Sequence, residues 1–154
     1  MKKVSLLFAL FLLFITSYGQ NENDITRMLG ESILKSKNKY ENSPYLAYKN
    51  PPLLLCSDGL PNRYAQQNRT FYENIGLETM SWHNTTFYQE KMIQGIDVME
   101  VSYYLKGNIF EVCIHFLTAT EENNEIFLAY WFESIDKYIY EYSCETNEWR
   151  LVEE

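Results

Sequence analysis

The chain has 154 residues with 21 acidic and 13 basic side chains, which gives a formal net charge of −8 at pH 7. A surplus of negative charge repels polyanions, which excludes nucleic acid and anionic membrane surfaces as favoured partners. The two histidines, His83 and His115, lie far apart, and the three cysteines form no Cys-x-x-Cys pair. The sequence therefore predicts no metal site and no other cofactor.

Residues 1–19 have the parts of a secretory signal peptide. Two lysines form a positive start, residues 4–15 are an apolar run apart from Ser5, and Ser17 and Gly19 are the small residues before the cut. The run of about twelve residues is shorter than the roughly 20 that span a hydrocarbon layer, so we expect cleavage and no stable membrane anchor. The sequence predicts export to the periplasm or the extracellular space, and the short lysine-led signal is typical of bacteria.

Residues 20–154 have the length of a single domain with one core. Without the two signal lysines they carry 11 basic and 21 acidic side chains, a formal charge of −10. The excess lies in residues 76–154, which have four basic and fifteen acidic side chains. We expect this half to form a solvated acidic surface, and the alternative is a docking face for a basic partner.

Residues 25–39 have the apolar spacing of an amphipathic helix. The positions that share one stripe are Ile25, Met28, Leu29, Ser32, Ile33 and Ser36. Asp24 stands at the N-cap position, and three lysines gather towards the C-terminal end, where the helix dipole favours cations. The sequence therefore predicts a helix that buries this stripe.

The segment that follows mixes prolines with short apolar runs, so its predicted elements are short. They are a loop at 40–52, a strand at 53–56, a helix at 62–75 that ends before Gly76, a strand at 77–82, and a helix or strand at 86–94.

From Asp97 onward the apolar period changes to two, and turn residues recur at short intervals. The five predicted strands are residues 98–105, 109–117, 126–135, 138–144 and 149–152. Strands joined in succession by short turns form an antiparallel meander.

The first hairpin can be predicted residue by residue from a two-residue turn at Gly107-Asn108. The pairs on the face that this register makes apolar are Leu105–Phe110, Tyr103–Val112, Val101–Ile114 and Met99–Phe116. The pairs on the opposite face are Tyr104–Glu111, Ser102–Cys113, Glu100–His115 and Val98–Leu117. Because a one-residue slip would invert both faces, this agreement of turn and alternation strongly favours the hairpin.

The registers of the later strands are predicted from parity and turns. The residues with the parity of a core face are Ile126, Leu128, Tyr130 and Phe132. A connection of three to five residues is expected before them, within Glu121 to Asn124. In the last hairpin a Thr146-Asn147 turn predicts the pairs Cys144–Trp149 and Tyr142–Leu151.

One or two helices followed by a curved antiparallel sheet of about five strands is an α+β arrangement with the helix on one face. This order and length resemble the cystatin-like and NTF2-like groups of small domains over most of residues 20–154. The resemblance implies a helix-packed cone or cleft, and it carries over no functional residue.

The second face of the first hairpin has the residue types of a cysteine hydrolase. Cys113 and His115 share one side of a strand, Glu100 faces His115, and Ser102 faces Cys113. A thiolate activated by an oriented histidine is a nucleophile. Neighbours two residues apart on a strand point outward about 6 to 7 Å apart, beyond hydrogen-bond reach. We therefore expect a structural Glu–His pair and keep the hydrolase as an alternative.

Aromatic residues provide the candidate binding surface, which comprises Tyr104, Trp131, Tyr138, Tyr140 and Tyr142. If the tyrosine stripe faces outward, it forms a platform that suits a basic protein or a sugar. If it faces the helix, it is core, and the predicted pairing of Tyr142 with Leu151 favours core or partial burial.

The sequence predicts a small exported non-catalytic protein of the binding or inhibitor type, whose partner is a protein with a basic surface or a carbohydrate. The alternatives are the hydrolase and an envelope structural component without a specific ligand. An oxidising compartment permits one disulfide and leaves one thiol among Cys56, Cys113 and Cys144.

Overall fold

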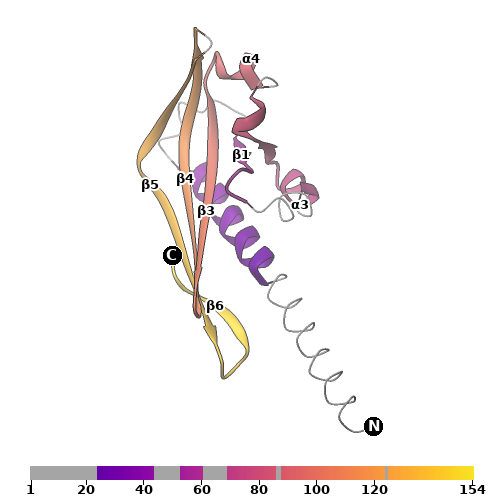
Figure 1. Cartoon of the computed structure of the whole chain (residues 1–154), viewed down its shortest axis with the longest axis vertical. Coiled ribbons are helices and arrows are strands. Elements are labelled where there is room, and N and C mark those ends of the chain that lie inside the picture. The colour runs from indigo at the N-terminus through magenta and orange to yellow at the C-terminus, as the bar shows by residue number, and fades with distance from the viewer. Residues whose placement is uncertain (1–23, 44–52, 61–68, 86–87, 124) are drawn as a thin grey trace.

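The computed structural model describes residues 24–43, 53–60, 69–85, 88–123 and 125–154, without the side chains of 69–70 and 131–134. These residues form a mixed α+β fold on one six-stranded sheet with the strand order β2-β1-β3-β4-β5-β6. The long strands β3, β4 and β5 run side by side along the molecule (Figure 1). The predicted signal peptide lies outside the described residues. None of the described helices combines the length and the apolar character needed to cross a membrane.

The predicted first hairpin is confirmed in β3 (Ile96–Lys106) and β4 (Ile109–Glu122). Every predicted pair is present, and the pairing continues as far as Ile96 and Ala119. Gly107 has a φ of 61°, the left-handed conformation that a two-residue hairpin turn requires. We call the side of the sheet that carries Met99 and Phe116 the first face, and the side that carries Glu100 and His115 the second face.

The predicted N-terminal helix spans residues 24–42 of the described chain and packs on the first face. The stripe residues from Met28 to Ser36 are buried, as the spacing predicts. The helix continues beyond the predicted end at residue 39, because Tyr40 is also anchored in the core. Its ring stacks on Phe116 with centroids 5.4 Å apart, and its hydroxyl donates a 2.7 Å hydrogen bond to buried Asp97.

Strand β5 (Glu125–Ser143) joins two strands that the sequence separates at Asp136 and Lys137. The strand continues because each charge has a partner: Asp136 lies 3.5 Å from the Lys39 ammonium, and Lys137 lies 3.1 Å from Glu111. The predicted three-to-five-residue connection before β5 is wrong. Glu122 pairs with Glu125, which leaves a two-residue turn whose first member, Asn123, has a φ of 56°.

A bulge in β5 reverses the faces of its two halves. His115 pairs with Ile135 and Leu117 with Tyr130, so β5 contains three more residues than β4 at this point. Before the bulge, Ile126, Leu128 and Tyr130 therefore lie on the second face with Leu117, where they are exposed. Their predicted place in the core is wrong, whereas Phe132 lies among the side chains that the structure does not describe.

Strand β6 (Glu148–Glu153) pairs with the end of β5, but in a register two residues from the predicted one. Tyr142 faces Trp149 and Tyr140 faces Leu151, because the turn spans residues 144–147 and ends with Asn147 at a φ of 55°. A shift of two residues preserves the faces, so Tyr140 still lies on the first face.

The meander therefore contains four strands, β3 to β6, in place of the five predicted. The other two are β1 (Leu54–Cys56) and β2 (Glu78–Met80), and β1 lies parallel to both β2 and β3. The short helices are α3 (Arg69–Asn74), the 3-10 helix η2 (Trp82–Asn84) and α4 (Gln89–Met92). Gly76 follows α3 with a φ of 74°, as the predicted C-terminal glycine requires.

The sheet has a hydrophobic cluster on each face. The first face packs on the N-terminal helix and α3 through Met28, Leu29, Ile33, Tyr72, Met99, Phe110, Val112, Ile114, Tyr138 and Tyr140. The second face has a smaller cluster under α4, formed by Leu54, Cys56, Met80, Tyr88, Met92, Ile96, Val98, Leu117 and Ala119. The rest of the second face is therefore the part of the described sheet where a ligand could reach the strands.

Candidate ligand-binding cavity

A cavity of about 650 Å³ lies on the second face, next to the smaller cluster. Its floor comes from β3 and β4, and its walls come from the turn after β1, from η2 and from β5 on both sides of the bulge. The side chains that give it chemical character are Cys56, Asp58, Trp82, Glu100, His115 and Tyr130. A volume of this size suits a small organic molecule or an inserted side chain.

Glu100 is the central polar group of the cavity. The Trp82 indole N–H donates a 2.7 Å hydrogen bond to its Oε1, and the Tyr130 hydroxyl donates a 3.1 Å hydrogen bond to its Oε2. Partial burial, and then the neighbouring Glu100 carboxylate, raise the pKa of Tyr130. None of the described lining residues is a lysine or arginine, so Glu100 and Asp58 meet no cation within the cavity.

The turn after β1 positions the Trp82 wall. Asp58 Oδ2 accepts a 2.7 Å hydrogen bond from the Trp82 backbone N–H, and Ser57 donates to the Met80 carbonyl. Gly59 brings this turn against β3, because a Cβ at this position would lie 1.8 Å from the Val101 carbonyl oxygen. The cavity rim is thus built from two segments that follow parallel strands.

His115 and Tyr130 form the opposite side. Their rings meet edge to face, with centroids 6.4 Å apart and planes at 87°. His115 pairs with Glu100 on β3 and with Ile135 on β5, so it lies at the bulge itself. The bulge places Tyr130 and Ile135, five positions apart in sequence, on the same cavity.

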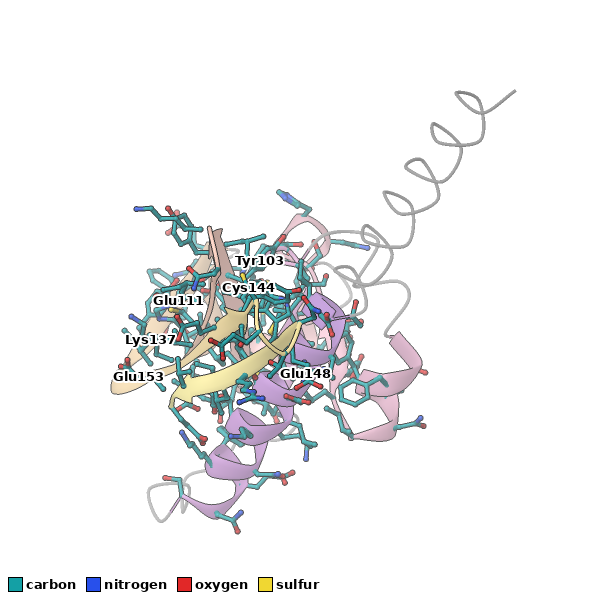
Figure 2. All side chains as sticks on the ribbon, turned by 90° about the horizontal axis from the view of Figure 1, so that it is seen from below. Tyr103, Glu111, Lys137, Cys144, Glu148 and Glu153 are labelled. Atoms are coloured by element: carbon teal, nitrogen blue, oxygen red, sulfur yellow. The ribbon has the colours of Figure 1, made fainter. Side chains whose placement is uncertain are left out.

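The structure brings together only part of the predicted hydrolase group. Glu100, His115 and Ser102 line the cavity, and the predicted Glu100–His115 pair is present. Cys113 is not among the described lining residues, and its Sγ donates a 3.5 Å hydrogen bond to Glu111. Glu111 also contacts Lys137, and both residues are labelled in Figure 2. Burial, and then Glu111, raise the pKa of Cys113, which opposes the formation of a thiolate nucleophile.

Cys56 is a cavity residue that the sequence did not single out. Parallel pairing of β1 with β3 sets it directly beside Glu100. Burial, together with the nearby Asp58 and Glu100 carboxylates, raises the pKa of this thiol to about 11, so it stays protonated near neutral pH. The permitted disulfide does not form, since all three cysteines lie in described residues as free thiols.

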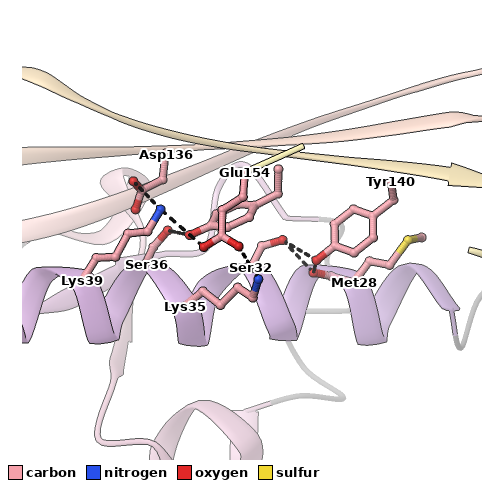
Figure 3. A network of polar contacts seen from close by, with 9 residues as sticks. Met28, Ser32, Lys35, Ser36, Lys39, Asp136, Tyr140 and Glu154 are labelled. Carbon is pink, nitrogen blue, oxygen red and sulfur yellow. Dashed lines mark hydrogen bonds and ion pairs between the residues drawn. The ribbon is translucent and has the colours of Figure 1, made fainter. Parts of the chain in front are cut away.

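Of the five predicted surface aromatics, the four whose side chains are described do not come together. Tyr138 and Tyr140 are buried beneath the N-terminal helix, where their hydroxyls contact Ser36 at 2.9 Å and Ser32 at 3.0 Å (Figure 3). Tyr142 is half-buried against Trp149, and Tyr104 is exposed on the second face. The Trp131 side chain lies outside the described part. The tyrosine stripe is thus mainly core, the alternative that the predicted pairing favoured.

No cluster of three or more His, Cys, Asp or Glu side chains among the described residues is placed to hold a metal ion. Comparison of the chain with protein-family models, with curated protein sequences and with solved structures gives no match. The cavity and the surfaces of the sheet are therefore the observations that bear on function.

Proposed function

We propose that the protein is an exported, non-catalytic binding protein whose cavity holds an organic cation or the basic side chain of a protein partner. One observation supports this best: the carboxylates of Asp58 and Glu100 and the rings of Trp82 and Tyr130 line the cavity, with no lysine or arginine among its described residues. Export is supported by the signal-peptide pattern of residues 1–19. The proposed layout is cystatin-like or NTF2-like, in which a cavity lies beside a curved sheet.

The lining suits a cation for two physical reasons. A cation over the face of a tryptophan or tyrosine ring gains about 0.5 to 2 kcal/mol. A carboxylate held by neutral donors, as Glu100 is, attracts a cation more strongly in a cavity than in open water, because less water screens the two charges. The apolar stem of a lysine or arginine would contact Ile135 and the rings.

The hydrolase alternative has weaker support. A cysteine nucleophile requires a thiol whose pKa lies near or below neutral pH and a base within reach. Cys56 lies in the cavity, but its pKa of about 11 is too high, and Cys113 donates its proton towards Glu111.

Calorimetric titration of residues 20–154 with N-acetyl-lysine amide and N-acetyl-arginine amide tests the proposal. N-acetyl-norleucine amide is the uncharged comparison, and it is expected to bind at least about tenfold more weakly. Glu100→Gln keeps a carbonyl oxygen that accepts from the Trp82 indole and offers an amide N–H that can donate to the Tyr130 hydroxyl, but it removes the charge. It should therefore weaken binding of the basic probes about tenfold.

Glu111→Gln is the matched control, because Glu111 lies on the same face but outside the described cavity lining. Equal binding of norleucine amide and lysine amide, or equal loss of affinity in the two variants, would show that charge in the cavity does not select the ligand.

A further inference from the structure

No strand of the described residues covers the outer edge of β5 over its first half. Strand β6 pairs only with residues 139–143 of β5, and no other described strand pairs with that edge. Along Glu125 to Tyr130 the inner edge of β5 pairs with β4, which leaves backbone N–H and C=O groups on the outer edge for another strand. Figure 1 shows this half of β5 along the border of the sheet, on the side away from β3.

Exposed apolar side chains line this edge on both faces. Ile126, Leu128 and Tyr130 point to the second face and are 37%, 42% and 55% exposed. Phe127 points to the first face and is 49% exposed. Edge strands in monomers are usually protected by a lysine, a proline or a bulge, and residues 126–130 contain no charged residue, proline or glycine.

The charge around this edge selects the chemistry of its occupant. Residues 107–136 contain no lysine or arginine at all. Glu121, Glu122 and Glu125 cluster at the end of the β4–β5 hairpin, and none of them forms an ion pair with a described residue. A second copy of the chain would bring another formal charge of −10, whereas a basic segment would be attracted.

We propose that residues 125–130 of β5 accept an extended basic segment of a protein partner as an additional strand of the sheet. Backbone hydrogen bonds along the open edge supply affinity, and the alternating apolar side chains of the segment pack on Ile126 and Leu128 on the second face. Lysine or arginine side chains of the segment pair with the hairpin glutamates. This site goes beyond the proposed cavity function. The substitutions that alter it are at Leu128 and Glu125, which do not line the described cavity, whereas Tyr130 borders both sites.

The probe is an acetylated and amidated ten-residue peptide of alternating valine and lysine, and a second version carries an N-methyl group on every residue. The wild-type protein should bind the first peptide and slow the hydrogen exchange of residues 125–130. The fully N-methylated version has the same charge but has no backbone N–H to donate along either edge, so it should bind at least about tenfold more weakly.

Leu128→Lys places a like charge on the edge and should weaken binding of the first peptide at least about tenfold. Ile93→Lys is the matched control, because it makes the same charge change at a site that is 68% exposed next to α4 and should leave binding unchanged. Glu125→Gln should weaken binding less and reduce its salt dependence. Glu100→Gln should leave peptide binding unchanged, which separates this site from the cavity.

Three results would overturn the proposal. Equal binding of the N-methylated peptide would mean that the acidic surface adsorbs any cationic chain. Exchange protection away from residues 125–130 would place the peptide elsewhere. Sedimentation of a wild-type dimer that Leu128→Lys dissociates would mean that a second copy occupies the edge.

Discussion

The two halves of β5 share an apolar alternation but lie in opposite environments. After the bulge, Tyr138 and Tyr140 are 0% and 1% exposed beneath the N-terminal helix. Before the bulge, Ile126, Leu128 and Tyr130 point to the other face and stay exposed. Three extra residues reverse the face, and only one face has a long helix over it. Alternation alone therefore predicts that a strand has two faces, and the packed partner decides which of them is buried.

The largest test of this contrast removes one tyrosine ring from each half. Tyr140→Ala leaves a cavity between the sheet and the helix and should lower the free energy of unfolding by about 3 to 5 kcal/mol. Tyr130→Ala removes a largely exposed ring and should lower it by less than about 1 kcal/mol. Urea unfolding of residues 20–154 measures both, and similar losses would mean that the two halves are equally packed.

Alkaline pH should also act through the buried tyrosines. Burial raises the pKa of Tyr72 to about 12, and it raises the pKa values of Tyr138 and Tyr140. A raised pKa in the folded protein gives stability that is complete below pH 10 and is lost as pH rises towards the folded value. Deprotonation of Tyr72 alone should lower the free energy of unfolding by roughly 2 to 3 kcal/mol between pH 10 and 12.

Unfolding measured at steps of pH, with tyrosinate absorbance as the second signal, tests this expectation. In Tyr72→Phe the free energy of unfolding should fall less steeply as the pH rises above 10. Stability that stays constant up to pH 12 would contradict the burial of these hydroxyls.

The hydrogen bonds between the N-terminal helix and the part of β5 after the bulge should contribute intermediate amounts to the free energy of unfolding. Ser36 and Tyr138 contact each other across the interface and are both fully buried. Ser36→Ala and Tyr138→Phe should each lower the free energy of unfolding by about 1 to 2 kcal/mol, because each leaves a buried hydroxyl without its partner. The double variant should lose less than the sum, and strict additivity would mean that the two hydroxyls are not coupled.

The ion pairs at the margin of the interface between the N-terminal helix and the sheet should contribute least to the free energy of unfolding. Lys35 and Lys39 both reach Glu154 after the end of β6, and the hydrogen bond from Lys35 lowers the pKa of Glu154 (Figure 3). The stabilisation is therefore present above pH 4.5 and is lost as pH falls through the lowered value. Lys35→Gln should change stability less than Ser36→Ala at pH 7 and should have no effect at pH 2. A larger effect at pH 2 would contradict this sign.

The sequence predicts well those parts of the fold that short-range chemistry determines. A two-residue turn and a period of two fix all the pairs of the β3–β4 hairpin, and the helix stripe from Met28 to Ser36 is buried as its spacing requires. The later strands have no such constraint. The bulge at residues 131–134 contains no glycine or proline to mark it, so the parity of Ile126 to Tyr130 gave the wrong face.

The candidate cavity was predicted only in part for a related reason. Glu100 and His115 are paired within the hairpin, and that pair was predicted. Cys56 and Trp82 reach the same place through parallel pairing of β1 with β2 and β3. Parallel strands are joined by long connections, so the sequence contains no short turn that indicates which strands pair.

Gly59 gives the cavity rim an unusual pattern of tolerance to substitution. The residue lies in an exposed turn, where most positions accept many side chains, yet even alanine would place a methyl group against the backbone of β3. In a complete mutational scan selected for folded protein, position 59 should therefore be as intolerant as a core position, while its exposed neighbour Asp58 accepts more replacements. An exposed position that accepts only glycine would identify, in any related sequence, the point where this turn meets the sheet.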